Sequence, residues 1–296
     1  MGLISHCKVY AFRALNRVVW RLGVHRLLPE KPSPTDVETY SEWRRAGTSD
    51  EVKMMIESGV RIASQTVLDF GCAEGGKLLA WANEGPRMLI GIDTDFRLLR
   101  VNLGLSSNSI SGQLRVNLVQ NDSRSLPFRS DVIDTILCID VMEHVEHVED
   151  VIREWYRVLS PGGQAFVRYQ HFDMPFAYHA DRVLLIPWCH LWSTDSELRQ
   201  LVKLACEDRR FAAGGDAGQG GTIPFLNRLT VFGFHRTVEA AGFKIAVWQL
   251  RAFKGKTQPM ARWMSKLLGR LSRLRPYLSR DLVCVLRKPA IPNVML

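Results

Sequence analysis

The sequence lacks closely spaced cysteines and lacks any apolar run long enough to span a bilayer. Its six cysteines are scattered through 296 residues without a C-x-x-C pair, and they lie at positions 7, 72, 138, 189, 206 and 284. This spacing argues against a zinc site or a disulfide framework and fits a reducing compartment. Arginines also interrupt the first apolar stretch, so neither a signal peptide nor a transmembrane helix is expected. We therefore expect a cytoplasmic protein.

Acidic residues are missing from two segments. Residues 1–29 contain five Lys/Arg and residues 251–280 contain nine, and neither segment contains Asp or Glu. The net charge of +9 thus comes from these segments, because the rest has 39 − 14 = 25 basic against 30 acidic residues. Arginines opposite apolar residues at helical spacing are typical of helices that lie on a membrane surface. We expect peripheral membrane association rather than nucleic-acid binding; the alternative is an ordinary solvated helix face.

From residue 66 onwards the apolar pattern predicts alternating strands and helices. Strands are expected near residues 66–70, 88–92, 115–119, 133–139, 164–169, 243–250 and 282–287. Helices are expected near residues 75–84, 95–103, 144–158 and 230–241, with a tight turn at 160–163. This alternation predicts an α/β fold in which helices cover both faces of a mostly parallel, doubly wound sheet.

The same patterns divide the chain into four parts. Residues 1–45 contain a basic amphipathic helix over 10–28 and a linker with prolines. Residues 46–170 form the core of the sheet and include, before the first strand, a short helix that Ser49 or Asp50 caps. Residues 171–229 are an aromatic insertion after the fifth strand and a candidate lid over an acceptor. Residues 230–296 complete the sheet and carry the basic segment 251–280.

The most informative residues follow three of the predicted strands. The first strand runs into a glycine turn, Asp69-Phe70-Gly71-Cys72-Ala73-Glu74-Gly75-Gly76, and the second ends at Asp93. Glycines let the backbone approach a nucleoside cofactor, and an acid at the end of the next strand can bind its ribose hydroxyls. The fourth strand ends in Asp140-Val141-Met142-Glu143-His144.

These motifs, with Asp122 in an N-D-S-R-S-L-P-F segment, resemble the class I S-adenosylmethionine-dependent methyltransferases, particularly the branch that acts on small molecules. The resemblance is good over residues 66–163 and implies a Rossmann-like fold of seven strands, with the last strand reversed and S-adenosyl-L-methionine as cofactor. It implies that Asp93 binds ribose and that Asp122 contacts the adenine amino group. The cofactor-binding residues that it implies are Asp69, Gly71, Cys72, Ala73, Gly75, Asp93, Asp122, Ser123 and Asp140. Members of the family usually have glycine where Ala73 stands.

Two other functions are compatible with the sequence. Gly71-x-Ala73-x-x-Gly76 also fits a variant dinucleotide fingerprint, with Asp93 about 20 residues further on, and would then indicate a nicotinamide-dependent oxidoreductase. The segment around Asp122 and the Glu143-His144 pair favour the methyltransferase. Because the sequence contains no clear acceptor motif, a scaffold that binds the cofactor without turnover is the second alternative.

Histidines at strand ends are the candidates for catalysis. His144 follows the fourth strand and His171 the fifth, so either could remove a proton from an acceptor hydroxyl. Both also have an ordinary structural interpretation. No histidine or acid has a spacing that indicates a metal site. The expected acceptor is a small molecule, a glycan or a lipid-linked compound, methylated on oxygen or nitrogen.

Overall fold

The computed structural model describes residues 3–23, 37–73, 75, 77–95, 115–180, 183–208, 223–252 and 272–290. The predicted linker and most of the predicted helix at 95–103 and of the basic segment 251–280 lie outside these ranges. The chain divides into two compact units. We call residues 44–169, 231–249 and 282–296 the sheet unit, and residues 1–43, 170–230 and 250–281 the helical unit.

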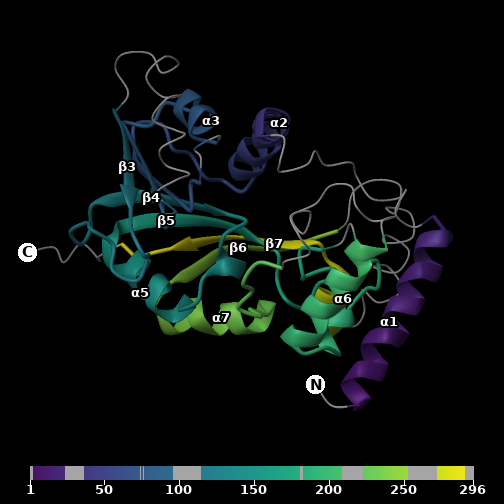
Figure 1. Ribbon diagram of the computed structural model, residues 1–296. Coiled ribbons are helices and arrows are strands. Elements are labelled where there is room, and N and C mark those ends of the chain that lie inside the picture. The colour runs from purple at the N-terminus through teal and green to yellow at the C-terminus, as the bar shows by residue number, and fades with distance from the viewer. Residues whose placement is uncertain are drawn as a thin grey trace, which may run out of the picture. The chain divides into compact units, whose positions relative to one another are not determined.

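The sheet has seven strands in the order β3-β2-β1-β4-β5-β7-β6 (Figure 1). The strands are β1 (Thr66–Phe70), β2 (Met88–Asp93), β3 (Arg115–Gln120), β4 (Ile133–Ile139), β5 (Leu159–Tyr169), β6 (Lys244–Arg251) and β7 (Asp281–Arg287). Neighbours from β3 to β5 pair in parallel, whereas β7 runs antiparallel to β5. The predicted fold class, a mostly parallel seven-stranded sheet with one reversed strand, is therefore confirmed. The reversed strand also distinguishes this sheet from the all-parallel 3-2-1-4-5-6 order of dinucleotide-binding domains.

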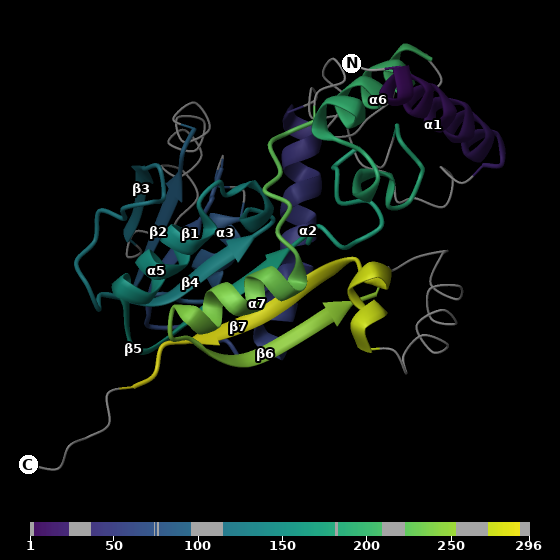
Figure 2. The same cartoon turned by 90° about the horizontal axis from the view of Figure 1, so that it is seen from below.

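Helices cover both faces of the sheet (Figures 1 and 2). The C-terminal part of α2 (Val37–Glu57) and α3 (Leu78–Asn83) lie on one face, where Met55 and Trp81 are fully buried in a cluster with strand residues such as Leu137. On the other face lie α5 (Val148–Val158) and α7 (Val231–Ala240). Trp155 of α5 packs edge-on against Phe70 of β1, with ring centroids 5.0 Å apart.

Three boundaries differ from those expected. The helix expected to start at Ser49 or Asp50 is the longer α2, which begins at Val37, so these residues lie inside it. The helix expected over 144–158 is divided into a short 3-10 turn, Met142–His144, and α5, since Val145 is extended between them. The expected turn at 160–163 is instead an irregular part of β5: the pairing with β4 steps from Ile133↔Leu159 to Thr135↔Gln164.

In the helical unit, α1 (Leu3–Arg21) packs along α6 (Asp195–Glu207) (Figure 2). Asn16 of α1 is buried, and its side-chain amide forms two hydrogen bonds with the segment around residue 184. It donates to the Val183 carbonyl at 2.8 Å and accepts from the Leu185 backbone amide at 2.7 Å. The amphipathic helix thus exists, but it begins and ends earlier than the expected 10–28. Within the described residues, none of the helices is both long and apolar enough to cross a membrane.

Several cations of α1 pair with acids of the same unit. Lys8 lies 2.5 Å from Glu197, and both Arg13 and Arg17 bind Asp208, Arg13 at 2.6 Å. Hydrogen bonds from Arg17 and then Arg13 hold the pKa of Asp208 well below its usual range. Part of the positive charge of residues 1–29 is therefore used inside the protein, which sequence alone does not show.

The ends of β1 and β4 meet at a glycine. Gly71 follows β1 with φ +76°, and a methyl group on it would overlap the side chain of Val141, which follows β4. Its amide donates to the Ile92 carbonyl of β2 at 2.8 Å. Glycine is thus needed here both for its backbone conformation and for the close approach of two strand ends.

This close approach makes Gly71→Ala more destabilising than an ordinary glycine substitution. We expect a cost of roughly 1–2 kcal/mol for the left-handed backbone and about 1–3 kcal/mol for overlap with Val141. Gly85→Ala is the matched control, since Gly85 has φ +71° but open space around its Cα. Urea unfolding should separate the two variants, and Val141→Ala should recover part of the loss in Gly71→Ala. Equal stability of Gly71→Ala and Gly85→Ala would contradict the close approach.

Candidate active site

The predicted cofactor loop lies at the carboxyl ends of β1 and β2. The amides of Gly71 and Cys72 both donate to the Ile92 carbonyl, at 2.8 and 3.0 Å. Gly75 closes the turn with φ +73° and donates its amide to the Cys72 carbonyl at 2.8 Å. Cys72 is buried and fits against Gly91, where a methyl group would lie 2.8 Å from its sulfur. The loop is therefore fixed by backbone contacts and small residues.

Asp93 joins this loop to the end of β2. Its carboxylate accepts one hydrogen bond from the Ala73 amide and one from the Asp95 amide, at 2.8 and 2.9 Å. A carboxylate offers about four acceptor positions, so each oxygen keeps capacity for a further donor. Ala73 has φ +48°, a conformation in which an alanine is strained and a glycine is not. The chain thus keeps a glycine-like backbone where the family usually has glycine.

Asp122 and Ser123 follow β3 in a tight bend. The Ser123 amide donates to the Asn121 side chain at 2.7 Å, with Ser123 itself at φ +67°. Asp122 is exposed and forms an ion pair with Arg124 at 3.0 Å, and this hydrogen bond lowers the pKa of Asp122. The structure therefore keeps Asp122 ionised and open to solvent. Its predicted contact with adenine stays a prediction.

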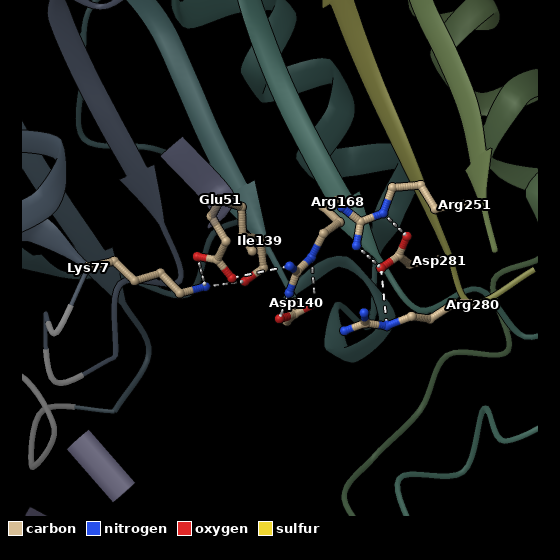
Figure 3. Close-up of polar contacts among 8 residues, drawn as sticks. All are labelled: Glu51, Lys77, Ile139, Asp140, Arg168, Arg251, Arg280 and Asp281. Carbon is tan, nitrogen blue, oxygen red and sulfur yellow. Dashed lines mark hydrogen bonds and ion pairs between the residues drawn. The ribbon is translucent and has the colours of Figure 1, made fainter. Parts of the chain in front are cut away.

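A buried chain of ion pairs ends at Asp140 (Figure 3). Arg168 of β5 binds Asp140 through its Nε at 3.2 Å, and it binds Glu51 of α2 at 3.2 Å with another nitrogen. Glu51 in turn binds Lys77, also at 3.2 Å. The side chains of Glu51, Lys77 and Arg168 are only 9–11% exposed. This chain of alternating charges links α2, the start of α3 and the ends of β4 and β5.

Arg168 fixes Asp140 through its backbone as well. The Asp140 amide donates to the Arg168 carbonyl at 2.9 Å, and Asp140 has φ +59°. The left-handed residue turns the chain from β4 into the 3-10 turn that carries Glu143 and His144. Sequence reasoning placed Asp140 at the site but missed Glu51, Lys77 and Arg168. An arginine inside the otherwise apolar strand Ala165–Tyr169 was the one signal that could have revealed them.

Two further acids, Asp69 and Glu143, lie near the end of β4. Both are buried, at 4% and 3% exposure. Together with burial, which is the larger cause, their charges raise the pKa of the Cys138 thiol well above its usual value. Cys138 is therefore protonated and serves as a core residue, not as a nucleophile. His144 is half-buried in the 3-10 turn, and its amide donates to the Val141 carbonyl at 2.8 Å.

His171, the second predicted catalytic residue, belongs to the helical unit. It is fully buried, and its Nε2 lies 2.9 Å from the Ser279 hydroxyl. Burial lowers the pKa of His171 to about 3, so the ring is neutral and weakly basic at physiological pH. These contacts favour the structural interpretation of His171. Near the same segment, Asp281 is 2% exposed and receives hydrogen bonds from Arg251 at 2.7 and 3.0 Å (Figure 3).

The described part of the predicted lid contains a hollow. Its walls include aromatic and cationic side chains, namely Phe172, Tyr178, His190, Arg199, Phe225 and Arg228. Burial lowers the pKa of His190 to about 4, and its Nε2 donates to the Phe172 carbonyl at 2.8 Å. Arg228 is held by Asp195 at 2.5 Å. The lid role of residues 171–229 stays a prediction.

Known proteins resemble parts of this chain in sequence. Residues 68–167 match the family model described as "Methyltransferase domain". A ubiquinone biosynthesis O-methyltransferase from Pseudomonas fluorescens is 32% identical over 112 residues, which are 38% of this chain and 47% of that protein. A sterol 24-C-methyltransferase from Pneumocystis carinii is 29% identical over 109 residues, 36% of this chain and 28% of that protein. The matched part thus spans less than half the length of these curated relatives.

Solved structures share the fold over most of the chain. An S-adenosylmethionine-dependent methyltransferase from Mesorhizobium loti superposes with a TM-score of 0.51 and 18% identity, covering 79% of this chain and 96% of that one. The cyclase SpnF superposes with a TM-score of 0.54 and 16% identity, covering 84% and 83%. Residues 68–167 thus match a methyltransferase domain, and the fold around them is shared with an S-adenosylmethionine-dependent methyltransferase. The second likeness shows that this fold is not limited to proteins named methyltransferases.

The residues of this methyltransferase domain fit S-adenosyl-L-methionine, the cofactor that its class implies. The Asp93 carboxylate is held at the loop with acceptor capacity left for two ribose hydroxyls. The buried acids Asp69 and Glu143 also lie near the ends of β1 and β4, where negative charge suits a sulfonium cation. When bound, the cofactor supplies a methyl group on positively charged sulfur.

Because Glu51 lies inside the buried ion-pair chain, we expect its substitution to lower the stability of the fold more than substitution of an exposed acid. Glu51→Gln leaves Lys77 and Arg168 without their shared counter-charge, and removal of one partner from a buried pair costs roughly 3–5 kcal/mol. Glu57→Gln on the same helix is the control, because its side chain is 65% exposed and 3.9 Å from Lys53. That exposed pair should contribute below about 1 kcal/mol. Urea unfolding of both variants measures the difference, and similar losses would contradict the ion-pair chain.

Proposed function

We propose that this protein transfers a methyl group from S-adenosyl-L-methionine to an oxygen or nitrogen atom of a small-molecule, glycan or lipid-linked acceptor. The observation that carries the proposal is the Asp93 carboxylate, held by the Ala73 and Asp95 amides beside a glycine-bearing loop. Such a carboxylate is pre-oriented for two hydroxyl donors, so binding need not order it further.

The main requirement of methyl transfer is that the protein aligns the acceptor atom with the methyl group and the sulfur. Methyl transfer is a direct displacement, in which a lone pair of the acceptor forms a bond to the methyl carbon as the carbon–sulfur bond breaks. Orientation of the two reactants supplies most of the acceleration. A base is needed only where the acceptor atom still carries its proton. We propose His144 for that role, because it stands in the turn after β4, at the edge where ligands of open α/β sheets bind.

The acceptor is proposed to be lipid-like and met at a membrane surface. Two relatives are named for sterol and for ubiquinone biosynthesis, and both of those compounds are hydrophobic. The acid-free segments at residues 1–29 and 251–280 add positive charge that suits an anionic bilayer.

Each alternative has its own distinguishing feature. A nicotinamide-dependent oxidoreductase would be expected to have a parallel sixth strand, whereas β7 is antiparallel to β5. A scaffold without turnover would bind the cofactor with the same residues. Only product formation separates that scaffold from an enzyme.

Asp93 provides the first test. Asp93→Ala removes two charge-assisted hydrogen bonds, each worth roughly 1.5–3 kcal/mol, so affinity for S-adenosylmethionine should fall at least about tenfold in calorimetry. Asp93→Asn keeps one oxygen acceptor and should lose less. Asp131→Ala, which removes an exposed carboxylate paired with Lys288, is the control and should bind normally. Unchanged affinity in a folded Asp93→Ala protein would refute the ribose assignment.

His144 provides the second test. His144→Asn should reduce transfer of labelled methyl groups into membrane-lipid and metabolite extracts by about 100-fold, with cofactor affinity retained. His147→Asn changes an exposed histidine nearby and should keep the wild-type rate. Rates should be measured from pH 6 to 9. If His144→Asn keeps the wild-type rate throughout that range, the reaction uses alignment without this base.

A further inference from the structure

Helix α1 has two apolar faces on opposite sides. One face, with Val9, Asn16 and the partly buried Phe12 and Trp20, packs into the core of the helical unit. The other face is exposed, and its apolar or small residues recur every three or four positions. They are Ile4, Cys7, Ala11, Leu15, Val18 and, in the turn that follows the helix, Leu22. Val9 and Ala11 are two residues apart and therefore point about 200° away from each other. Among the described residues, packing inside the unit thus leaves this second row of side chains exposed.

The exposed stripe contains large apolar side chains. Ile4 is 87% exposed, Leu22 75%, Val18 50% and Leu15 45%. Single exposed apolar residues are ordinary, but a continuous row along one helix marks an interaction surface. We call this row of α1, whose large apolar members are Ile4, Leu15, Val18 and Leu22, the exposed stripe.

The charges beside the stripe select the partner. At 100° per residue, Arg17 and Arg21 fall on one side of the stripe and Lys8 on the other. The acids that pair with Arg17 and Lys8 are covered, with the side chain of Asp208 10% exposed and that of Glu197 5% exposed. The Arg17 side chain remains 50% exposed. The outward surface of α1 is therefore apolar in the middle and positive or neutral at its borders.

Two protein partners from this chain are disfavoured by charge. Pairing α1 with a second copy would bring two arginine-lined borders together with no acid between them. Residues 253–271, which lie outside the described ranges, contain five Lys/Arg and no acid, so they would be repelled too. An anionic bilayer complements the positive borders and also accepts the apolar stripe.

We infer that α1 docks on an anionic lipid bilayer through the exposed stripe, lying in the plane of the interface. The inference extends the proposed function, because a lipid-like acceptor would be reached at that surface. It selects one face of α1, whereas the sequence alone indicated an amphipathic helix over 10–28 without showing which of its apolar residues the fold covers.

Vesicle co-sedimentation of the full chain tests this inference. The triple variant Leu15→Gln/Val18→Gln/Leu22→Gln keeps helix propensity and leaves the buried face intact. It should lose about tenfold or more in binding to vesicles of phosphatidylcholine and phosphatidylglycerol. Phe232→Gln is the matched control, because Phe232 is 70% exposed on α7 in the sheet unit. Arg21→Gln should weaken binding more than Lys244→Gln, and salt should weaken binding of the wild type.

Three outcomes would overturn the inference: no binding at low salt, equal binding to vesicles of phosphatidylcholine alone, or a wild-type dimer in size-exclusion chromatography that the triple variant converts to monomer. Calorimetry with S-adenosylmethionine on the same preparations keeps this result separate from the proposed function. The triple variant should bind the cofactor normally. A wild-type protein that binds vesicles but not the cofactor would refute the proposed methyl transfer and leave the docking surface standing.

Discussion

The geometry of the candidate site depends on the buried side chain of Arg168, whose positive charge needs acidic partners inside the protein. It lies in β5 with its side chain 10% exposed, and it is neutralised by Glu51 on one side and Asp140 on the other. An isolated ion in such a place would be prohibitively costly, so the two acids are required wherever Arg168 is buried. Asp140, held by the side chain and backbone of Arg168, has φ +59° and turns the chain after β4 towards the segment with Glu143 and His144. Val141 in this turn lies against Gly71.

The proposed cofactor site lies at the carboxyl edge of the sheet, which these contacts hold in place. The loop after β1 is closed by backbone hydrogen bonds, and Asp93 ties it to β2, so a nucleoside would meet groups that are already oriented. Preorganisation of this kind suits a reaction whose main requirement is alignment. The fold alone does not identify the chemistry, since the structural neighbours include a cyclase as well as methyltransferases. For that reason the proposed activity rests on specific residues at the carboxyl edge of the sheet.

The parts that sequence predicted well are those governed by local pattern. Buried apolar runs located β1 and β4 at their observed bounds, and glycine with a following acid indicated the loop and Asp93. What failed depends on tertiary contacts. Ser49 lies inside α2 although its sequence resembles a cap, and the helix expected from His144 starts only at Val148 because Val145 is extended. The partners Glu51 and Arg168 are far apart in sequence, so only the fold reveals their pairing.

The most direct test of this account is calorimetric binding of S-adenosylmethionine and of NAD⁺ to the same folded protein. The account predicts saturable binding of S-adenosylmethionine with one site per chain and no measurable heat with NAD⁺. Binding of NAD⁺ in place of S-adenosylmethionine, or binding of neither, would contradict the assignment of the loop and of Asp93 to the methyl donor.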